Sequence, residues 1–376
     1  MTLEADSRPA ASLAGGVGIR HLAVIGRVAR PSGGEGERAA RDYAASELRS
    51  LGFDVHEERF AFSAFPGRYA TPIAGALLGG TIVAACVLSL LGATTMAVVA
   101  LLGVGVLATA LFARWMLADG VLTVSWLRAR AVNLVATRGS AAPRVWLVAH
   151  LDSKSQPLPS AARVAGILLL AAALVLMVVT LLLTPGGTAS RMMWWVALCV
   201  GASGALPVMA SVVGADSDGA VDNASGVAAV LAAAAQLGHH VSCGVLLPSA
   251  EELGLAGARA WATGHHTGIA LNCDGVDDDG TLVIMYNQRA PQDLVAAVRA
   301  AAPPHMRARA RRMPLGLLTD STALAAAGWQ AVTVSHGSLA TLRRVHTSRD
   351  SLAALRGTAI DEVAGILARA VEALAT

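Results

Sequence analysis

The sequence predicts an α/β protein with a mixed, largely parallel central sheet flanked by helices and with four inserted transmembrane helices in two hairpins. Outside two long apolar regions, strand-like and helix-like patterns alternate along the chain, which is typical of a sheet covered by helices. The 376 residues are also 55% hydrophobic and only 15% charged, whereas soluble domains average about 25% charged residues. That difference indicates membrane-spanning segments.

The first apolar region covers residues 72–113 and is too long for one membrane span. It divides at residues 92–95 into two segments of about 20 residues, each of which matches the roughly 30 Å hydrocarbon layer of a bilayer. Gly75 and Gly79 form a GxxxG pattern on the first segment, which favours close packing against another helix. Residues 70–117 are therefore predicted to form transmembrane hairpin 1.

The second apolar region contains segments 164–183 and 192–213, and the Pro185-Gly186 dipeptide between them indicates a turn. Residues 162–213 are therefore predicted to form transmembrane hairpin 2. Since each hairpin returns to its starting side, the polar remainder lies on one side of the membrane. This remainder is predicted to form one discontinuous domain from residues 1–69, 118–161 and 214–376.

Basic residues near the spans predict the orientation of this multi-pass membrane protein. The side of the polar domain carries Arg68, Arg114, Lys154 and Arg163, whereas the opposite loops offer only Arg191. The positive-inside rule then places the polar domain in the cytoplasm.

The polar remainder predicts a regular succession of elements. Strands are expected at residues 53–62, 132–137, 144–150, 241–247, 269–274, 281–286 and 330–335. Helices are expected at residues 38–51, 221–237, 255–263, 292–301, 321–327 and 359–374.

Several functional classes are disfavoured by composition. No basic cluster with interleaved aromatic residues appears, so nucleic acid is not an expected partner. The four cysteines, Cys86, Cys199, Cys243 and Cys273, share no CxxC spacing, which argues against a disulfide framework and a cysteine-based zinc site.

Residues that bind hard metal ions follow the carboxyl ends of three predicted strands, where sites form in open α/β sheets. A fourth group lies in a late loop, and a fifth lies at the start of the helix expected at 221–237. The set consists of His150, Asp152, Asp222, Glu251, Glu252, Asp274, His346 and Asp350.

Each residue of the set also has an ordinary structural interpretation. Asp222 precedes a helix and could simply cap its N-terminus. A histidine that ends a strand is usually a half-buried structural residue, and paired glutamates usually begin a solvated helix. Their joint placement at consecutive strand ends favours a common site.

The chemistry of zinc accounts for the set. Two metal ions about 3.5–4 Å apart can share one carboxylate and polarise a carbonyl together. Such a site needs a bridging aspartate, one histidine and one carboxylate for each ion, and a free carboxylate as base. Asp222, His150, Asp274, Glu252, His346 and Glu251 fill these six roles, and Asp152 could orient the His150 imidazole as a hydrogen-bond acceptor.

Five motifs carry a resemblance to a known family. AHLDS, DNASGVAAVL, AEELGLAGARA, LNCDG and VHTSRD resemble, in this order, the motifs of the di-zinc aminopeptidases of peptidase family M28 (aminopeptidase Y type). The similarity covers nearly all of the chain outside the hairpins. It implies the zinc exopeptidase-like version of the predicted fold.

The resemblance also implies roles for the residues and two Zn²⁺ ions per chain. His150 and Asp274 would bind one zinc, Glu252 and His346 the other, and Asp222 would bridge the two. Glu251 would be the general base.

Three positions depart from the family. Val345 stands where the family often has a tyrosine that stabilises the oxyanion, and Tyr286 is a less direct candidate for that role. Asp320 matches a family element whose next residue is histidine, but Ser321 follows it here. The long segment between His150 and Asp222, usually a short loop, contains a predicted hairpin.

These observations predict a membrane-anchored zinc metallopeptidase, an aminopeptidase that hydrolyses N-terminal peptide bonds with a metal-activated water. Its expected partners are peptide substrates, including membrane-associated ones, and the lipid bilayer. One alternative is a glutaminyl-cyclase-like or deacylase-like zinc enzyme on the same fold, and cyclases use one zinc. The other alternative is a non-catalytic, peptidase-like membrane scaffold.

Overall fold

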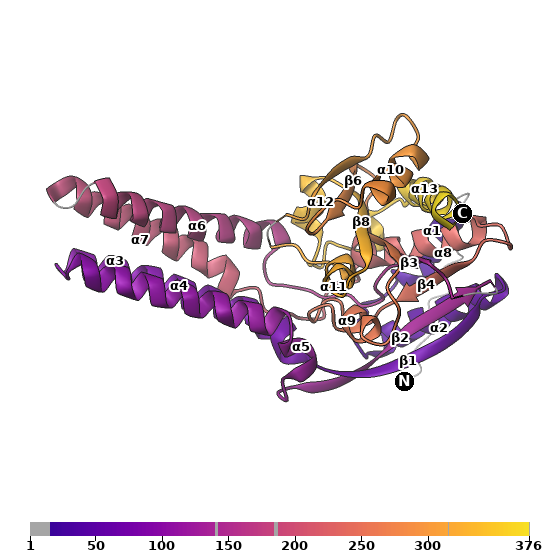
Figure 1. Cartoon of the computed structure of the whole chain (residues 1–376), viewed down its shortest axis with the longest axis horizontal. Coiled ribbons are helices and arrows are strands. Elements are labelled where there is room, and N and C mark those ends of the chain that lie inside the picture. The colour runs from indigo at the N-terminus through magenta and orange to yellow at the C-terminus, as the bar shows by residue number, and fades with distance from the viewer. Residues whose placement is uncertain (1–15, 140–141, 184–186, 315, 376) are drawn as a thin grey trace, which may run out of the picture.

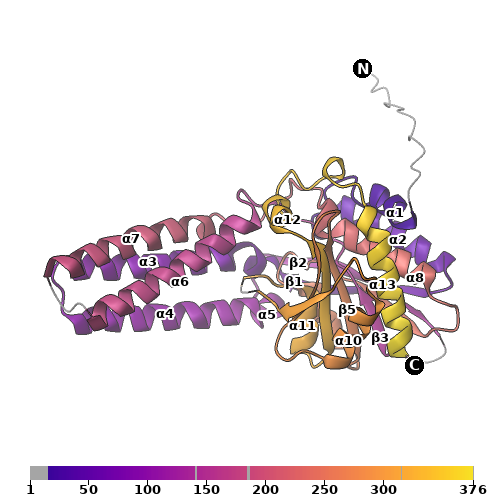
Figure 2. The same ribbon diagram turned by 90° about the horizontal axis from the view of Figure 1, so that it is seen from above.

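The structure is a computed structural model that describes residues 16–139, 142–183, 187–314 and 316–375. It consists of an α/β domain and a bundle of four long helices that extends from one end of that domain (Figures 1 and 2). The predicted fold class is confirmed. The Pro185-Gly186 turn lies outside the described residues.

The α/β domain is organised around an eight-stranded sheet with the order β1-β2-β4-β3-β5-β8-β6-β7. The four central strands, β4, β3, β5 and β8, run parallel, while β2 and β6 flank them in antiparallel pairing. The strands are β1 (Asp54–Ser63), β2 (Arg128–Arg138), β3 (Val145–Val148), β4 (Cys243–Leu247), β5 (Ile269–Val276), β6 (Thr281–Tyr286), β7 (Arg309–Arg312) and β8 (Gln330–Gly337). The carboxyl ends of the central strands therefore meet at one edge of the sheet.

Helices cover both faces of this sheet. One layer contains α1 (Val17–Ile25), α2 (Glu35–Ser50), α8 (Gly226–Gln236), α10 (Gln292–Ala301) and α13 (Thr358–Ala375). The opposite face is covered by α9 (Ala256–Ala262) and α11 (Asp320–Ala326).

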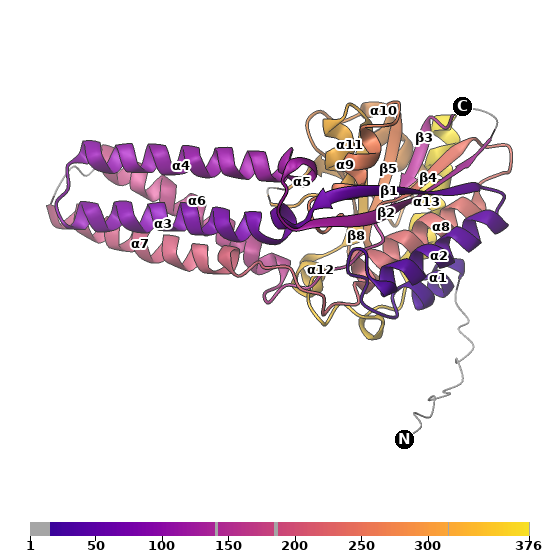
Figure 3. The ribbon, with the colours of Figure 1, turned by 90° about the horizontal axis from the view of Figure 1, so that it is seen from below.

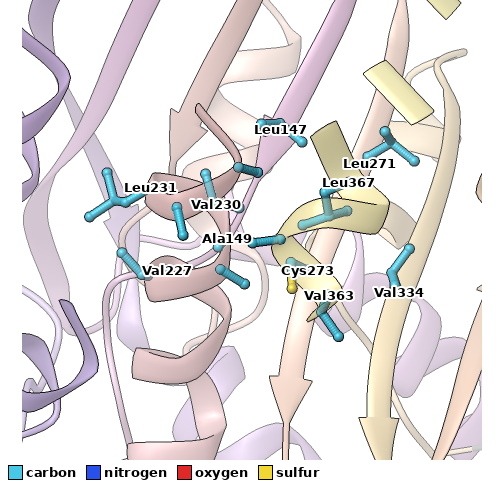
Figure 4. Packing of buried hydrophobic residues seen from close by; sticks show 14 of the residues in the cluster. Leu147, Ala149, Val227, Val230, Leu231, Leu271, Cys273, Val334, Val363 and Leu367 are labelled. Atoms are coloured by element: carbon cyan, nitrogen blue, oxygen red, sulfur yellow. The ribbon is translucent and has the colours of Figure 1, made fainter. Parts of the chain in front are cut away.

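The larger core lies where α8 and α13 pack on the central strands. Figure 4 shows Leu367 of α13 near Leu271 of the sheet, with Val227 and Leu231 of α8 in another part of the same cluster. Every residue of α8 from Gly226 to Ala234 is buried. The alanine-rich composition explains this burial, because small side chains let the helix lie close to its neighbours. The helix that follows Asp222 is therefore held firmly in the core.

Four long apolar helices form the bundle: α3 (Thr71–Leu90), α4 (Thr95–Leu117), α6 (Ser160–Leu183) and α7 (Gly187–Met209). All four are long and apolar enough to cross a membrane. Figure 3 shows α3 and α4 running side by side away from the α/β domain. Their exposed surfaces carry large apolar side chains such as Leu107 and Val175, as expected of helices that face lipid.

Gly75 and Gly79 make the close helix contact that their spacing predicts. Both glycines of α3 are buried and face α7: a Cβ at Gly75 would lie 2.7 Å from Val208, and one at Gly79 would lie 2.4 Å from Ala205. The absence of side chains therefore allows α3 and α7 to pack closely.

Replacing Gly79 with leucine should destabilise the bundle, because the new side chain would collide with α7. Overpacking of this kind costs about 1–3 kcal/mol. Gly80→Leu is the matched control, since Gly80 is exposed and a Cβ there meets nothing within 4 Å. Thermal unfolding in detergent should show a lower midpoint for Gly79→Leu only. Equal midpoints for the two variants would contradict the packing described here.

The structure also contains elements that the sequence patterns did not predict. These are α1, the short helices α5 (Gly120–Thr123) and α12 (Leu339–Arg344), and the edge strand β7. The helix expected at 221–237 is shorter than predicted: residues Ala220–Ser225 form a wider turn, and α8 begins only at Gly226.

Candidate metal centre

Two groups of potential metal ligands lie together at the carboxyl end of the central strands. His150, Glu251 and Asp274 form one group, in which the ligand atoms lie within 4.8 Å of one another. Asp222, Glu252 and His346 form the other by the same measure. The structure therefore brings together all six residues that the sequence singled out as ligands or base.

Asp222 lies between the two groups. Its Oδ1 is 3.2 Å from Nε2 of His150, and its Oδ2 is 2.9 Å from Nε2 of His346. One carboxylate thus offers a separate oxygen to each side, which is the arrangement that a bridging ligand requires. Burial opposes ionisation of Asp222, but the two imidazoles that face its carboxylate oxygens hold its pKa well below the usual range.

The interpretation of Asp222 as a helix cap is wrong. Asp222 has non-helical backbone angles, and α8 starts four residues later at Gly226. The backbone N–H of Gly226 instead donates to Oδ1 of Asn223 at 3.1 Å, and the N–H of Gly275 donates to the same oxygen. Because the neighbouring asparagine satisfies these donors, the Asp222 carboxylate is left free to face the histidines.

Asp152 acts differently from the prediction. The Nδ1 atom of His150 is 3.0 Å from the backbone oxygen of Asp152 and 3.6 Å from its carboxylate, so the main chain orients the imidazole. The carboxylate of Asp152 accepts the backbone N–H groups of Glu251 and Glu252 at 3.1 and 3.2 Å. Asp152 therefore positions the two glutamates and makes its closest imidazole contact through the backbone.

Backbone conformation reinforces this placement at two points. Ala250, directly before Glu251, has φ +58°, and His346 has φ +65°. Side-chain-bearing residues rarely adopt this left-handed region, and such strain concentrates at functional sites. The surrounding contacts therefore hold Ala250, the residue next to Glu251, and His346 in otherwise unfavourable backbone conformations.

Unsatisfied polar atoms indicate that the site fits cations. His150 Nε2 and Glu252 Oε1 are buried and have no hydrogen-bond partner among the described residues. Buried polar atoms are normally hydrogen-bonded, so such exceptions need an explanation. Both atoms belong to the ligand groups, and imidazole with carboxylate is a donor set that zinc accepts. The residues present therefore fit metal ions.

The adjacent residues Glu251 and Glu252 have pKa values shifted in opposite directions. Burial raises the pKa of Glu251 well above the usual range, the His150 charge opposes this effect, and the neighbouring carboxylate of Glu252 reinforces it. Glu252 shows the opposite behaviour. Burial opposes its ionisation, but Lys154 and His346 outweigh that effect and lower its pKa to about 2. The two adjacent glutamates are thus suited to proton transfer and to ligation respectively.

Lys154 and Ser160 are site residues that the sequence analysis missed. The Nζ atom of Lys154, counted there only as a basic residue near a span, lies 2.5 Å from Oε2 of Glu252. Ser160, the first residue of the apolar helix α6, lies 2.7 Å from His346 with its Oγ next to the ring atom Nδ1. The signal available in the sequence was their place in the short stretch that leads from His150 into the first turn of α6.

Replacing Ser160 with alanine should weaken zinc binding about tenfold or more, because partners of this kind orient metal-binding histidines. The measurement is a competition titration against a chelator of known affinity. Ser50→Ala, at an exposed serine of α2, is the control and should leave zinc affinity unchanged. An unchanged affinity in Ser160→Ala would show that this contact does not position His346.

Arg30 and Asp350 fix the loops that carry the ligands. Buried Arg30 donates to the backbone oxygens of Leu151 and Gly219 at 2.8 and 2.9 Å, which ties the segment after His150 to the one before Asp222. The carboxylate of Asp350 accepts the backbone N–H groups of Val221 and Asp222. Asp350, an expected member of the site, therefore supports the Asp222 turn.

The positions that depart from the family pattern lie as follows. Val345 is buried and lines the cavity at the site, whereas Tyr286 is not among the described residues that line it. Asp320 is buried, and neither of its carboxylate oxygens has a partner among the described residues. Burial, opposed by His150 and reinforced by Asp274, raises the pKa of Asp320 to about 8.

Comparisons with known proteins concern the family and the fold. Residues 196–371 match Peptidase family M28, and this segment holds every candidate ligand except His150. No curated protein matches the sequence.

Solved structures share the fold at low sequence identity. An aminopeptidase from Aneurinibacillus sp. strain AM-1 superposes with TM-score 0.54 and 14% identity over 95% of this chain and 93% of that one. BSAP, a zinc aminopeptidase from Bacillus subtilis, superposes with TM-score 0.55 and 13% identity over 94% of this chain and 93% of that one. A Porphyromonas gingivalis glutaminyl cyclase superposes with TM-score 0.53 and 15% identity over 95% of each chain. The chain therefore has the fold common to these zinc aminopeptidases and glutaminyl cyclases, and its residues 196–371 match Peptidase family M28.

Proposed function

We propose that this protein is a membrane-anchored, zinc-dependent aminopeptidase with two Zn²⁺ ions per chain. The observation that carries the proposal is the placement of Asp222, whose two carboxylate oxygens face His150 on one side and His346 on the other. His150 and Asp274 hold one ion, and Glu252 and His346 hold the second, with Asp222 shared between them. Bound zinc supplies Lewis-acid polarisation of a carbonyl and lowers the pKa of a water molecule.

Glu251 performs the proton transfers in this proposal. It belongs to the ligand group of His150 and Asp274, and its raised pKa suits a group that accepts and then returns a proton at neutral pH. Glu251 takes a proton from the attacking water and passes it to the amine that leaves. Lys154 contacts Oε2 of Glu252 and so directs Oε1 of Glu252 toward His346. This Oε1 lies 3.4 Å from Nε2 of His346.

A glutaminyl-cyclase-like enzyme is the main rival, because cyclases share this fold. Two complete ligand groups favour the two-metal peptidase over an enzyme that uses a single zinc ion. The same completeness argues against a non-catalytic scaffold, since all six positions of the predicted set are filled.

The four apolar helices support the membrane anchor, and we place the α/β domain in the cytoplasm. Lys154 and Arg163 line the cavity at the metal centre, so this orientation depends mainly on Arg68 and Arg114. Fusion of a fluorescent reporter or alkaline phosphatase to the C-terminus in a bacterial host tests it. We expect fluorescence without phosphatase activity, and the reverse would overturn the orientation.

The enzymatic proposal is tested in proteoliposomes with aminoacyl amides, their N-blocked counterparts and peptides tethered to lipid. We expect chelator-sensitive hydrolysis of the free-amine amides that returns on addition of zinc. Because the catalytic mouth lies beside the bundle, lipid-tethered peptides should react faster than soluble ones. The absence of metal-dependent hydrolysis would refute an aminopeptidase, while equal rates would refute only the preference for membrane-associated substrates.

A further inference from the structure

A cavity of about 950 Å³ extends from the metal centre into the helix bundle. At one end it is lined by Asp222, Glu251, Glu252 and Asp274, and at the other by apolar residues of α3, α4 and α6. The same continuous space therefore contacts the catalytic carboxylates and the interior of helices that are long and apolar enough to cross a membrane.

The apolar branch of this cavity follows helix α6. Its lining residues on α6 run from Ser160, where the helix begins, to Leu174, which lies about four helical turns later, roughly 20 Å along the helix axis. Leu78 of α3 and Ala113 of α4 line it as well. Within the bundle α3 packs on α4 and α7, and α6 packs on α7, while α4 and α6 have hardly any direct contact. This arrangement suits an aliphatic chain that enters from the bilayer.

Three arginines that form no ion pair with the described residues line the same cavity. Arg163 donates to Oε1 of Gln156 at 3.3 Å, but its Nε is buried without a partner, and no carboxylate of the described residues forms an ion pair with it. Arg309 and Arg311 of β7 are exposed, line the same cavity and form no ion pair within the described part of the chain. These three guanidinium groups are available to an anionic ligand.

The carboxylates that line the cavity already have roles in the proposed metal centre. Among the described residues that line it, the only acidic ones are Asp222, Glu251, Glu252 and Asp274, which are the metal ligands and the base. None is left to pair with the free ammonium group of an aminopeptidase substrate. A ligand that combines an apolar chain with an anionic group, and that needs no acidic partner for an ammonium group, therefore also matches this cavity.

We infer that the site also hydrolyses long-chain N-acyl amino acids. The acyl chain lies in the apolar branch, the carboxylate lies at one or more of the cavity-lining residues Arg163, Arg309 and Arg311, and the amide lies at the ligand groups. The reaction is R–CO–NH–CHR′–COO⁻ + H₂O → R–COO⁻ + ⁺H₃N–CHR′–COO⁻. The water oxygen bonds to the carbonyl carbon, the C–N bond breaks, and Glu251 carries a proton from the water to the leaving nitrogen. This inference rests on the hydrolytic part of the proposed function but requires no free amine.

The test uses the full-length protein in lipid nanodiscs, because detergent would compete for the apolar branch. Hydrolysis of N-lauroyl-alanine is compared with that of N-acetyl-alanine and of the neutral N-lauroyl-alanine methylamide. We expect N-lauroyl-alanine to be the best of the three by at least tenfold in kcat/KM. Equal values for the lauroyl and acetyl compounds would overturn the inference.

Two matched pairs of variants locate the binding site. Ala171→Phe should lower kcat/KM for N-lauroyl-alanine about tenfold and leave N-acetyl-alanine unaffected, because Ala171 lines the cavity. Ala172→Phe, at an exposed neighbour outside the lining, should change neither. Arg311→Gln should impair the anionic substrate but not its methylamide, while Arg312→Gln, outside the lining, should impair neither. The assigned cavity would be refuted if kcat/KM changed equally in Ala171→Phe and Ala172→Phe and equally in Arg311→Gln and Arg312→Gln.

A binding readout separates this inference from the enzymatic proposal. An N-acyl-alanine with a diazirine in its acyl chain is photolysed with chelator-treated protein, and we expect crosslinks on α6 between residues 163 and 174. Crosslinks there without hydrolysis would reject the hydrolytic function but support the acyl-chain site. Hydrolysis of aminoacyl amides without crosslinks or N-acyl cleavage would reject the inference and leave the aminopeptidase intact.

Discussion

Replacing Glu251 with glutamine should abolish hydrolysis while both metal ions remain bound. Glu251 is buried beside His150 and Asp274, and a glutamine of nearly the same shape cannot accept a proton from water. General acid–base catalysis contributes typically 10²–10⁴-fold, so we expect kcat to fall by at least about a hundredfold. Steady-state assays and zinc analysis of the same preparation measure the two quantities.

Glu252→Gln provides the contrast for this prediction. Because Glu252 contacts His346 and is held by Lys154, its loss should lower the zinc content as well as the activity. A Glu251→Gln enzyme that keeps near-wild-type activity would remove Glu251 from the mechanism. Loss of zinc in Glu251→Gln would make it a ligand instead of the base.

Replacing Asp222 with alanine should weaken the binding of both metal ions together. The Asp222 carboxylate is the only one that approaches both His150 and His346 in the described structure. We expect both zinc affinities to fall by at least about a hundredfold, measured by competition with a chelator. Asp274→Ala is the matched variant, since Asp274 belongs only to the His150 group, and it should weaken one site alone. Equal effects of the two substitutions would contradict a shared Asp222.

The sequence was sufficient to find the candidate ligands that the structure brings together, because each stands next to a recognisable local pattern. His150, Glu252 and Asp274 follow or end buried apolar strands, and such strands are readily predicted from their composition. Their convergence then follows from the parallel order of the central strands. The final partner, His346, comes from a loop and was found through the VHTSRD motif.

The supporting contacts could not be predicted, because they join residues distant in the chain. Arg30 reaches Gly219, and Ser160 reaches His346, and neither pair has a signature in local spacing. The role assigned to Asp152 differed for a related reason: its backbone oxygen is closer to His150 than its carboxylate is. Sequence patterns do not show whether the main chain or the side chain of a residue makes a contact.

Short polar elements were missed because their residues contradict the usual preferences. The edge strand β7 has the sequence Arg-Ala-Arg-Arg, without the alternation of apolar and polar residues that marks a half-buried strand. Only its pairing with β6 makes it a strand. That pairing also brings Arg309 and Arg311 to the cavity, so the charge of the proposed substrate could not be inferred before the structure was known.

Location of zinc by anomalous X-ray scattering at the zinc edge tests the two-metal centre most directly. We predict two peaks about 3.5–4 Å apart, one between His150 and Asp274 and one between Glu252 and His346, with Asp222 contacting both. A single peak in zinc-saturated crystals, or two peaks without Asp222 between them, would contradict the account.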